Sequence, residues 1–426
     1  MSMDPDVVRK DLLATGAEVH EAAAADATGT ADGPVPSLVA LPGSTEEAAA
    51  VMQVAAEHEL AVVARGTGSR LSWGTPAARC DLVVDMSRMA GVVEHSHGDL
   101  VARVQAGALM RAVQATLAQA GQEIALDLPA DASVGGIVAS GLAGPRRLRY
   151  GTPRDLLIGI TIVRADGTIA KSGGKVVKNV AGYDLGKLFA GSAGTLGLIT
   201  EATFRLHPLP AARAYVTAEY IAVSVACDAV AAAANSPLVS SAVELTRAEP
   251  GGPIQVGVLL EGSADGVADR AARMADLLGK GTVANSAPAW WPGAPRAGAA
   301  ETLLRVSFWV SALSHALDAI EAAAAKTGVP AVIAGSAGAG VLYVRTEASS
   351  QPLAVAGFVA ALRSAVAGER GAVVVLAAPA AVRKELAGHG GMNGPVPGLA
   401  LMRAVKDQFD PGHRLAPGRF PDGPGQ

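Results

Sequence analysis

The chain has few cysteines, few aromatic residues and no long apolar run. Cys80 and Cys227 are the only cysteines among 426 residues. Zinc and iron–sulfur sites need several cysteines at short spacing, which excludes such a centre built from this chain alone. No stretch reaches the roughly 18 unbroken apolar residues of a membrane span. The charged start, MSMDPDVVRKDLL, lacks the order of a signal peptide. We therefore expect two reduced thiols and a cytoplasmic protein.

The chain also lacks an excess of basic residues. Its formal net charge is −4 and its pI is about 6.1, which argue against a nucleic-acid partner, since a nucleic-acid-binding domain is typically basic. Half of the residues are hydrophobic but only 4% are aromatic. The core is therefore expected to consist largely of alanine and valine. The length predicts two to three domains.

The spacing of strand and helix patterns predicts four segments. Residues 1–33 form an N-terminal extension, 34–212 a first domain, 213–395 a second domain, and 396–426 a C-terminal segment that returns to the first domain. Within the first domain we expect strands at 61–64, 82–86 and 101–105, helices at 45–58 and 109–120, and a hairpin of 156–164 with 169–172.

The second domain contains a repeated pattern. Residues 214–278 have the order βαββα and residues 303–376 the order βαββαβ. Two split βαβ units side by side predict one large sheet with helices on one face. The fold class is therefore α+β, with a ferredoxin-like duplicated second domain.

Three segments are rich in glycine and small residues. The first, ARGTGSRL, follows a strand and offers successive backbone N–H groups to a pyrophosphate. It is neither a dinucleotide-binding GxGxxG motif nor a Walker A motif. The second spans 128–141 and the third 190–206. Tight turns with close packing explain each segment singly. The three together favour a ligand site.

These motifs carry a resemblance to a known family. RGTGS, PADASVGGIVASG, Tyr150-Gly151, an Asp-Gly hairpin and KNVAGYDLGKLFAGSAGTLGLITEATF follow one another in this order. The chain resembles the FAD-binding domain of the vanillyl-alcohol oxidase family, the PCMH-type fold with two α+β subdomains, over about 38–209 and the PGR tail. Within that family it is most similar to GlcE-type subunits of bacterial glycolate oxidase, on GPRRLRYGTPRDLLIG, KNVAGYDL and PGRF.

The resemblance implies an FAD site by position. It assigns the pyrophosphate to the first segment, the ribityl chain and flavin ring to the second, the adenosine end to the third, and a cation near the flavin to the tail. The implied residues are Arg65, Gly66, Thr67, Gly68, Ser69 and Arg70, then Pro129, Ser133, Val134, Gly135, Gly136 and Ser140, then Gly194, Gly197 and Ile199, and finally Arg419.

The chain departs from the family pattern at several positions. Gly141 and Ala416 stand where many relatives have asparagine, and Ala193 where many have glutamate, so each removes a polar contact. Ser69 stands where members with covalent flavin often carry histidine. Serine has no imidazole nitrogen, so the resemblance implies non-covalent FAD.

The sequence shows no convincing catalytic base and no metal site. His389 lies in a glycine-rich loop, and His95 with His97 lacks a nearby carboxylate. The HxH and HxGDGN-like segments of catalytic relatives are missing. Catalytic residues therefore stay unassigned. Arginine suits carboxylate recognition, so substrate-binding candidates are Arg146, Arg147, Arg149, Arg305 and Arg345, with solvated or phosphate-facing charges as the alternative.

Three functions remain open at this point. The first is an FAD-binding subunit of a glycolate or D-lactate oxidase complex. Its implied partners are a second FAD subunit of the GlcD type and an iron–sulfur subunit of the GlcF type, with only peripheral membrane contact through them. The second is a self-sufficient FAD-dependent 2-hydroxy-acid dehydrogenase. The third is a structural subunit that has lost FAD, which the intact glycine segments disfavour.

Overall fold

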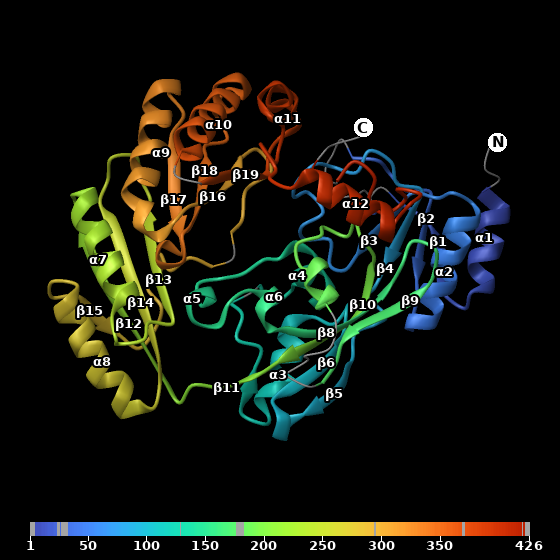
Figure 1. Cartoon of the computed structure of the whole chain (residues 1–426), viewed down its shortest axis with the longest axis horizontal. Coiled ribbons are helices and arrows are strands. Elements are labelled where there is room, and N and C mark those ends of the chain that lie inside the picture. Colours follow the sequence, from blue (N-terminus) through green and yellow to red (C-terminus); the bar gives the residue numbers. More distant parts are fainter. Residues whose placement is uncertain are drawn as a thin grey trace. The chain divides into compact units, whose positions relative to one another are not determined.

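A computed structural model of the chain describes residues 5–23, 26, 33–127, 129–175, 183–293, 295–368, 371–419 and 421 (Figure 1). The chain divides into two compact units. Unit 1 comprises Met1–Leu142, Thr152–Leu209 and Val396–Gln426, and unit 2 comprises Ala143–Gly151 and Pro210–Pro395. The short segment 143–151 therefore interrupts unit 1 in sequence and belongs to unit 2.

The first sheet of unit 1 has four strands in the order β1-β2-β4-β3. Strands β2 and β3 run parallel to β4, and β1 runs antiparallel to β2. The bounds are β1 (Glu18–Glu21), β2 (Leu38–Leu41), β3 (Val62–Arg65) and β4 (Leu82–Asp85), with helices α1 (Pro5–Ala14) and α2 (Thr45–Glu57). The expected helix start is confirmed: the Ser44 hydroxyl accepts a hydrogen bond from the Glu47 N–H at 3.0 Å.

The second sheet of unit 1 is antiparallel, in the order β5-β6-β10-β8-β9. The predicted hairpin is its β8–β9 pair. The strands are β5 (Val92–Ser96), β6 (Val101–Gln105), β8 (Leu157–Val163), β9 (Ile169–Gly173) and β10 (Leu198–Arg205); a small sheet pairs β7 (Gln122–Glu123) with β11 (His207–Pro208). The helices are α3 (Met110–Ala118), α4 (Val134–Ser140), α6 (Pro153–Leu156), η2 (His97–Asp99) and η3 (Leu185–Leu188).

The C-terminal segment packs as part of unit 1. Helix α12 (Leu399–Phe409) leads into a stretch that runs parallel to β3, in which the Val62 N–H donates to Arg414 O and the Ala416 N–H donates to Val62 O, both at 2.8 Å. The Phe409 ring meets the buried Phe189 ring edge to face at 5.5 Å. These contacts bring the PGR tail to the edge of the four-stranded sheet.

Unit 2 is built on one antiparallel eight-stranded sheet in the order β15-β12-β14-β13-β17-β18-β16-β19. Its helices α7, α8, α9 and α10 lie along one face of that sheet (Figure 1). The strands are β12 (Ala212–Tyr220), β13 (Ala242–Arg247), β14 (Ile254–Gly262), β15 (Thr282–Ala284), β16 (Leu303–Ser307), β17 (Ala331–Gly335), β18 (Val341–Thr346) and β19 (Ala372–Ala377). The helices are α5 (Arg147–Tyr150), α7 (Val223–Asn235), α8 (Ala264–Leu277), α9 (Leu313–Thr327), α10 (Pro352–Ala367), α11 (Ala380–Leu386), η4 (Val310–Ala312), η5 (Ala337–Ala339) and η6 (Ala387–His389).

The α+β fold and the duplicated second region are confirmed. Alternation along β16 and β18 explains the one-sided helix layer, because Leu304, Val306, Leu342 and Val344 are buried in the helix-covered core while their neighbours point the other way. The short edge strand β15 lies outside the two predicted repeats, which cover 214–278 and 303–376. No described helix has the length and apolar character needed to cross a membrane.

Candidate functional site

The first glycine segment leaves a row of backbone donors unused. It begins where β3 ends at Arg65 and turns through Gly68, whose φ is +73°. Within the described chain, no hydrogen bond uses the N–H groups of Gly66, Thr67, Gly68 or Ser69, while Leu71 N–H donates back to Gly68 O at 3.1 Å. Successive free N–H groups of this kind form a concave site for an anion. The loop therefore has the donors that a pyrophosphate requires.

The second segment lies directly against the first. A Cβ on Gly66 would stand 2.0 Å from the Ser133 hydroxyl, so only glycine permits this approach. Ser133 is buried and precedes α4, which contains Val134, Gly135, Gly136 and Ser140. The segment is thus a small-residue helix start rather than an open loop. Before this helix, the Pro129 carbonyl oxygen accepts a hydrogen bond from the Ala132 N–H at 3.0 Å.

The third segment joins the second through the backbone. The N–H of Gly191 donates to Val138 O at 2.9 Å, and that of Ala193 donates to Ala139 O at 2.7 Å. Gly194 has a φ of +77° and open space where a Cβ would stand. Gly197 and Ile199 are buried instead, Gly197 against the Phe189 ring and Ile199 in the core. Of the three predicted residues of this segment, only Gly194 presents open space.

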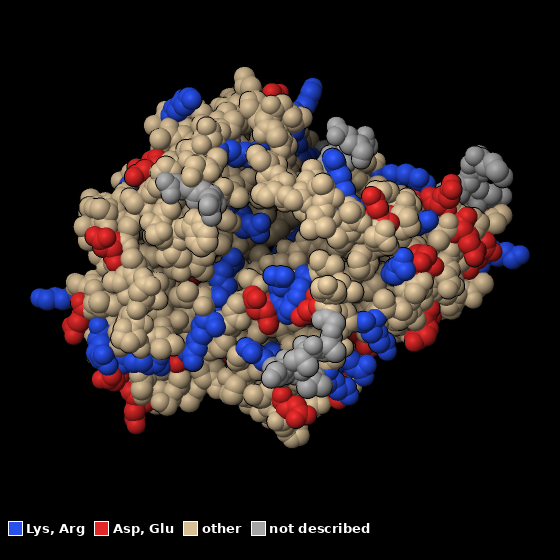
Figure 2. Space-filling model, in the orientation of Figure 1, with Lys and Arg blue, Asp and Glu red and all other residues tan. Residues whose placement is uncertain are grey.

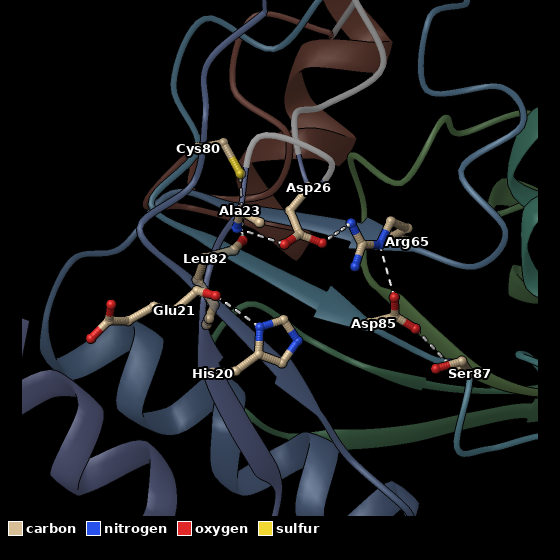
Figure 3. Close-up of polar contacts among 9 residues, drawn as sticks. All are labelled: His20, Glu21, Ala23, Asp26, Arg65, Cys80, Leu82, Asp85 and Ser87. Carbon is tan, nitrogen blue, oxygen red and sulfur yellow. Dashed lines mark hydrogen bonds and ion pairs between the residues drawn. The ribbon is translucent and has the colours of Figure 1, made fainter.

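Arg65 is held between two carboxylates (Figure 3). Its Nη1 lies 2.8 Å from Asp26 and its Nε 2.8 Å from Asp85. Burial by itself lowers the pKa of Arg65, but hydrogen bonds to the two carboxylates outweigh it and raise the pKa. Asp26 lies in the N-terminal extension and also accepts the Ala23 N–H at 2.8 Å. Arg65 therefore fixes the strand ends, and both acids already compensate its charge.

Arg70 of the first segment and Arg419 of the tail make other contacts. Arg70 Nη1 donates to the Ser69 hydroxyl at 3.1 Å and its guanidinium lies over the Trp73 ring. Arg419 donates to Leu71 O at 2.7 Å and to Trp73 O at 2.6 Å. Burial lowers the pKa of Arg419 to about 10. The tail is therefore hydrogen-bonded to the C-terminal end of the first glycine segment.

A buried ion pair between Lys406 and Asp410 fastens the third segment to the tail. The Lys406 ammonium also donates to Thr195 O at 2.7 Å and Leu415 O at 3.2 Å, while Asp410 accepts the Leu415 N–H at 2.8 Å. Sequence reasoning missed this pair, although Lys and Asp at i and i+4 before a Pro-Gly stop were a usable signal.

In unit 2 the arginines of segment 143–151 fall into two groups. Arg146 Nη1 lies 3.2 Å from the buried Glu261 carboxylate, and Arg149 donates to Glu261 O at 3.3 Å. Arg147 instead donates to the Tyr343 hydroxyl at 2.9 Å. The exposed Arg345 pairs with Glu301 at 3.5 Å. The five predicted substrate-binding arginines therefore do not share one environment.

The histidines and cysteines add no reactive cluster. His389 is exposed and contacts Glu385 O at 3.1 Å, and His95 contacts Gln122 at 2.9 Å. Burial raises the pKa of the Cys80 thiol to about 12 and that of Cys227 to about 11. Among the described residues, no group of three or more His, Cys, Asp or Glu side chains is placed to hold a metal ion.

The backbone is strained at two of the positions where the chain departs from the family pattern. Ala193 and Ala416 adopt φ values of +53° and +44°, where asparagine or glycine is easier to accommodate. Leu128, the run 178–182 and Phe420, which carried part of the resemblance, lie outside the described residues.

Comparison with known proteins identifies the domain. A family model described as "FAD binding domain" matches residues 36–173. Residues 36–173 are therefore similar to an FAD-binding domain. In fold the chain is similar to p-cresol methylhydroxylase solved with substrate bound, with a TM-score of 0.74 and 16% identity, covering 98% of this chain and 96% of that one. FAD is thus the cofactor of the domain that contains the first two glycine segments.

The sequence relatives match half of this chain or less. The glycolate oxidase subunit GlcD of Bacillus subtilis is 33% identical over 216 residues, 49% of this chain and 45% of that protein. A probable mitochondrial D-lactate dehydrogenase of Danio rerio is 34% identical over 45% of this chain and 39% of its own length. The glycolate oxidase subunit GlcE of Escherichia coli is 38% identical over 154 residues, 35% of this chain and 43% of that protein. The chain therefore spans less than half the length of these relatives.

Proposed function

We propose that this chain is the FAD-binding subunit of a complex that oxidises glycolate or D-lactate to the 2-oxo acid. Electrons would pass from the flavin to an iron–sulfur subunit, and a second FAD subunit would complete the complex. The names of the relatives support the substrate class, since they include glycolate oxidase subunits and D-lactate and D-2-hydroxyglutarate dehydrogenases.

One observation carries the FAD part of the proposal. Four successive N–H groups, from Gly66 to Ser69, have no acceptor within the described chain, and they stand beside the close contact of Gly66 with Ser133. A diphosphate supplies oxygens that can accept several such donors at once. These donors fit FAD, whose pyrophosphate they would bind.

The chain's own groups would act by binding and positioning. A bound flavin would supply the acceptor for the hydride that leaves the hydroxy acid. The N–H groups of residues 66–69 would hold the phosphates, and Arg70 would add positive charge beside them. Arg65 would keep the strand ends in place through Asp26 and Asp85. His58 pairs with Asp11 at 2.9 Å and His413 with Asp407 at 3.0 Å, but neither histidine belongs to the three glycine segments, so we assign the proton acceptor to a partner subunit.

The linkage of FAD is proposed to be non-covalent, because Ser69 offers no imidazole. Acid precipitation of the yellow protein should release the flavin into the supernatant. Colour retained in the washed pellet would show a covalent link and overturn this assignment.

A charge substitution tests the site itself. Ser69 is exposed, so Ser69→Glu should fold normally while placing a negative charge beside the phosphates. We expect at least a tenfold weaker FAD affinity, measured by flavin fluorescence on titration of the apoprotein. Thr116→Glu, at an exposed position of α3 in the same unit, makes the same charge change and should leave affinity unaltered. Equal affinity in both variants would refute the pyrophosphate assignment.

The second candidate is a self-sufficient FAD-dependent 2-hydroxy-acid dehydrogenase. It is favoured by the matches to a probable D-lactate dehydrogenase and a D-2-hydroxyglutarate dehydrogenase. Dye-linked turnover of glycolate or D-lactate by the purified chain alone would decide for it. Turnover only after addition of partner subunits would decide for the complex. A preparation that stays colourless with added FAD would support a structural subunit instead.

A further inference from the structure

The helix-free face of the unit 2 sheet brings one basic and one phenolic side chain together. Arg305 on β16 and Tyr343 on β18 are directly paired in register. Both alternate with residues buried under the helices, so both point to the opposite face. Directly opposed residues on adjacent strands have Cβ atoms about 5 Å apart. Their functional groups therefore share one small region of this face.

Arg305 has no acidic partner among the described residues. It is half-buried, its Nε is buried without a hydrogen bond, and no ion pair or hydrogen bond within the described chain involves its guanidinium. Burial, and in smaller part the nearby Arg147, lower the pKa of Arg305. Removing a cation from water without compensation is costly, so such a group points to an anion supplied from outside.

Arg147 adds a second cation beside the same phenol. Its Nη2 donates to the Tyr343 hydroxyl at 2.9 Å and its Nε donates to Gly144 O at 3.1 Å. No carboxylate of the described chain pairs with it. Its neighbour Arg146, by contrast, is engaged by Glu261. Segment 143–151 is therefore anchored by one arginine and presents another.

We propose that Arg305, Arg147 and Tyr343 of unit 2 form a binding site for the carboxylate of a small acid. The Arg305 guanidinium, which makes no hydrogen bond within the described chain, offers the planar, paired donors that match a carboxylate, and Arg147 adds a second positive charge beside it. The phenol beside them offers a hydrogen bond to a neighbouring hydroxyl or carboxylate oxygen. Naming the acid as a 2-hydroxy acid rests on the proposed function; the anion site itself rests on Arg305 and Arg147, with which no carboxylate of the described chain pairs.

The test measures binding of three acids, glycolate, D-lactate and acetate, and separately of inorganic phosphate, to the FAD-loaded chain by calorimetry. We expect Arg305→Gln and Arg147→Gln each to weaken glycolate binding at least tenfold, and Tyr343→Phe to weaken it several-fold. Arg305→Lys keeps the charge but loses the paired donors, so it should also bind weakly. Arg273→Gln, at an exposed arginine of α8 in the same unit, should bind as the unaltered chain does. Thermal unfolding of each variant shows that it is folded.

The outcomes separate this inference from the proposed function. No binding of any of the three acids, binding of inorganic phosphate alone, or glycolate binding that survives Arg305→Gln would overturn the carboxylate site. Each of these results is compatible with a normal flavin spectrum, which supports the FAD assignment independently. Acetate bound as tightly as glycolate would keep the anion site but remove the support for a 2-hydroxy acid.

Discussion

Two arginines of this chain, Arg65 and Arg305, differ in whether acidic side chains of the described chain pair with them. Arg65 in unit 1 lies between Asp26 and Asp85, each at 2.8 Å, and its pKa is raised. Arg305 in unit 2 has no carboxylate within the described chain, and burial lowers its pKa. A buried cation with two acids is a structural link. A half-buried cation with no acid beside it in the described chain lowers stability, which is typical of groups retained for binding.

The largest effect is expected from removing the partnered arginine. Arg65→Met leaves Asp26 and Asp85, whose side chains are 13% and 11% exposed, without their counterion. Breaking a buried pair from one side costs about 3–5 kcal/mol, so we expect a loss of about 3 kcal/mol in the free energy of unfolding. Urea unfolding of the apoprotein measures it.

A matched control uses a surface arginine of the same unit. Arg79 pairs with Asp81 at 2.6 Å, but its side chain is 58% exposed. Arg79→Met should change stability by less than about 1 kcal/mol. If the two variants lose the same amount, the structural role of Arg65 is wrong.

Removing the unpartnered arginine should have the opposite sign. Arg305→Met replaces an uncompensated cation with an apolar side chain of similar length. The free energy of unfolding should stay equal or rise by about 1 kcal/mol, because no buried acid is left unpaired. Urea unfolding of the same kind provides the comparison. A loss above about 2 kcal/mol would show that Arg305 has a stabilising role that the contacts do not reveal.

The sequence predicted those elements of the fold that depend on local residue patterns. Apolar alternation and cap residues such as Ser44 located the main strands and helices, and the duplication of unit 2 followed from their order. The glycine segments predicted that backbones approach closely, as Gly66 and Ser133 do. The second glycine segment, 128–141, contains the start of helix α4 at Val134.

Contacts between residues far apart in the chain could not be predicted from the sequence. The contact of Arg65 with Asp26 spans 39 positions, and that of Arg147 with Tyr343 spans 196. Arginine alone does not indicate whether an acid will meet it, so Arg65 was assigned to phosphate and Arg305 was one candidate among five. Only the folded positions of Asp85 and Tyr343 distinguish a link from an open site.

The smallest expected effect is a change in stability at acidic pH. It distinguishes the two arginines by how the stability around each depends on pH. The Ala23 N–H and Arg65 hydrogen-bond to Asp26 and lower its pKa despite partial burial. A carboxyl with a lowered folded-state pKa stabilises fully above its ordinary pKa of about 3.9 and loses that stabilisation as the pH falls through the folded value. The unaltered chain should therefore exceed Asp26→Asn by up to about 1 kcal/mol at pH 6, and the difference should shrink below pH of about 4. Urea midpoints from pH 6 to pH 3 measure it. Arg305→Met should show no such shrinking difference, because no acid pairs with that arginine; a parallel pH dependence would remove the distinction between the two sites.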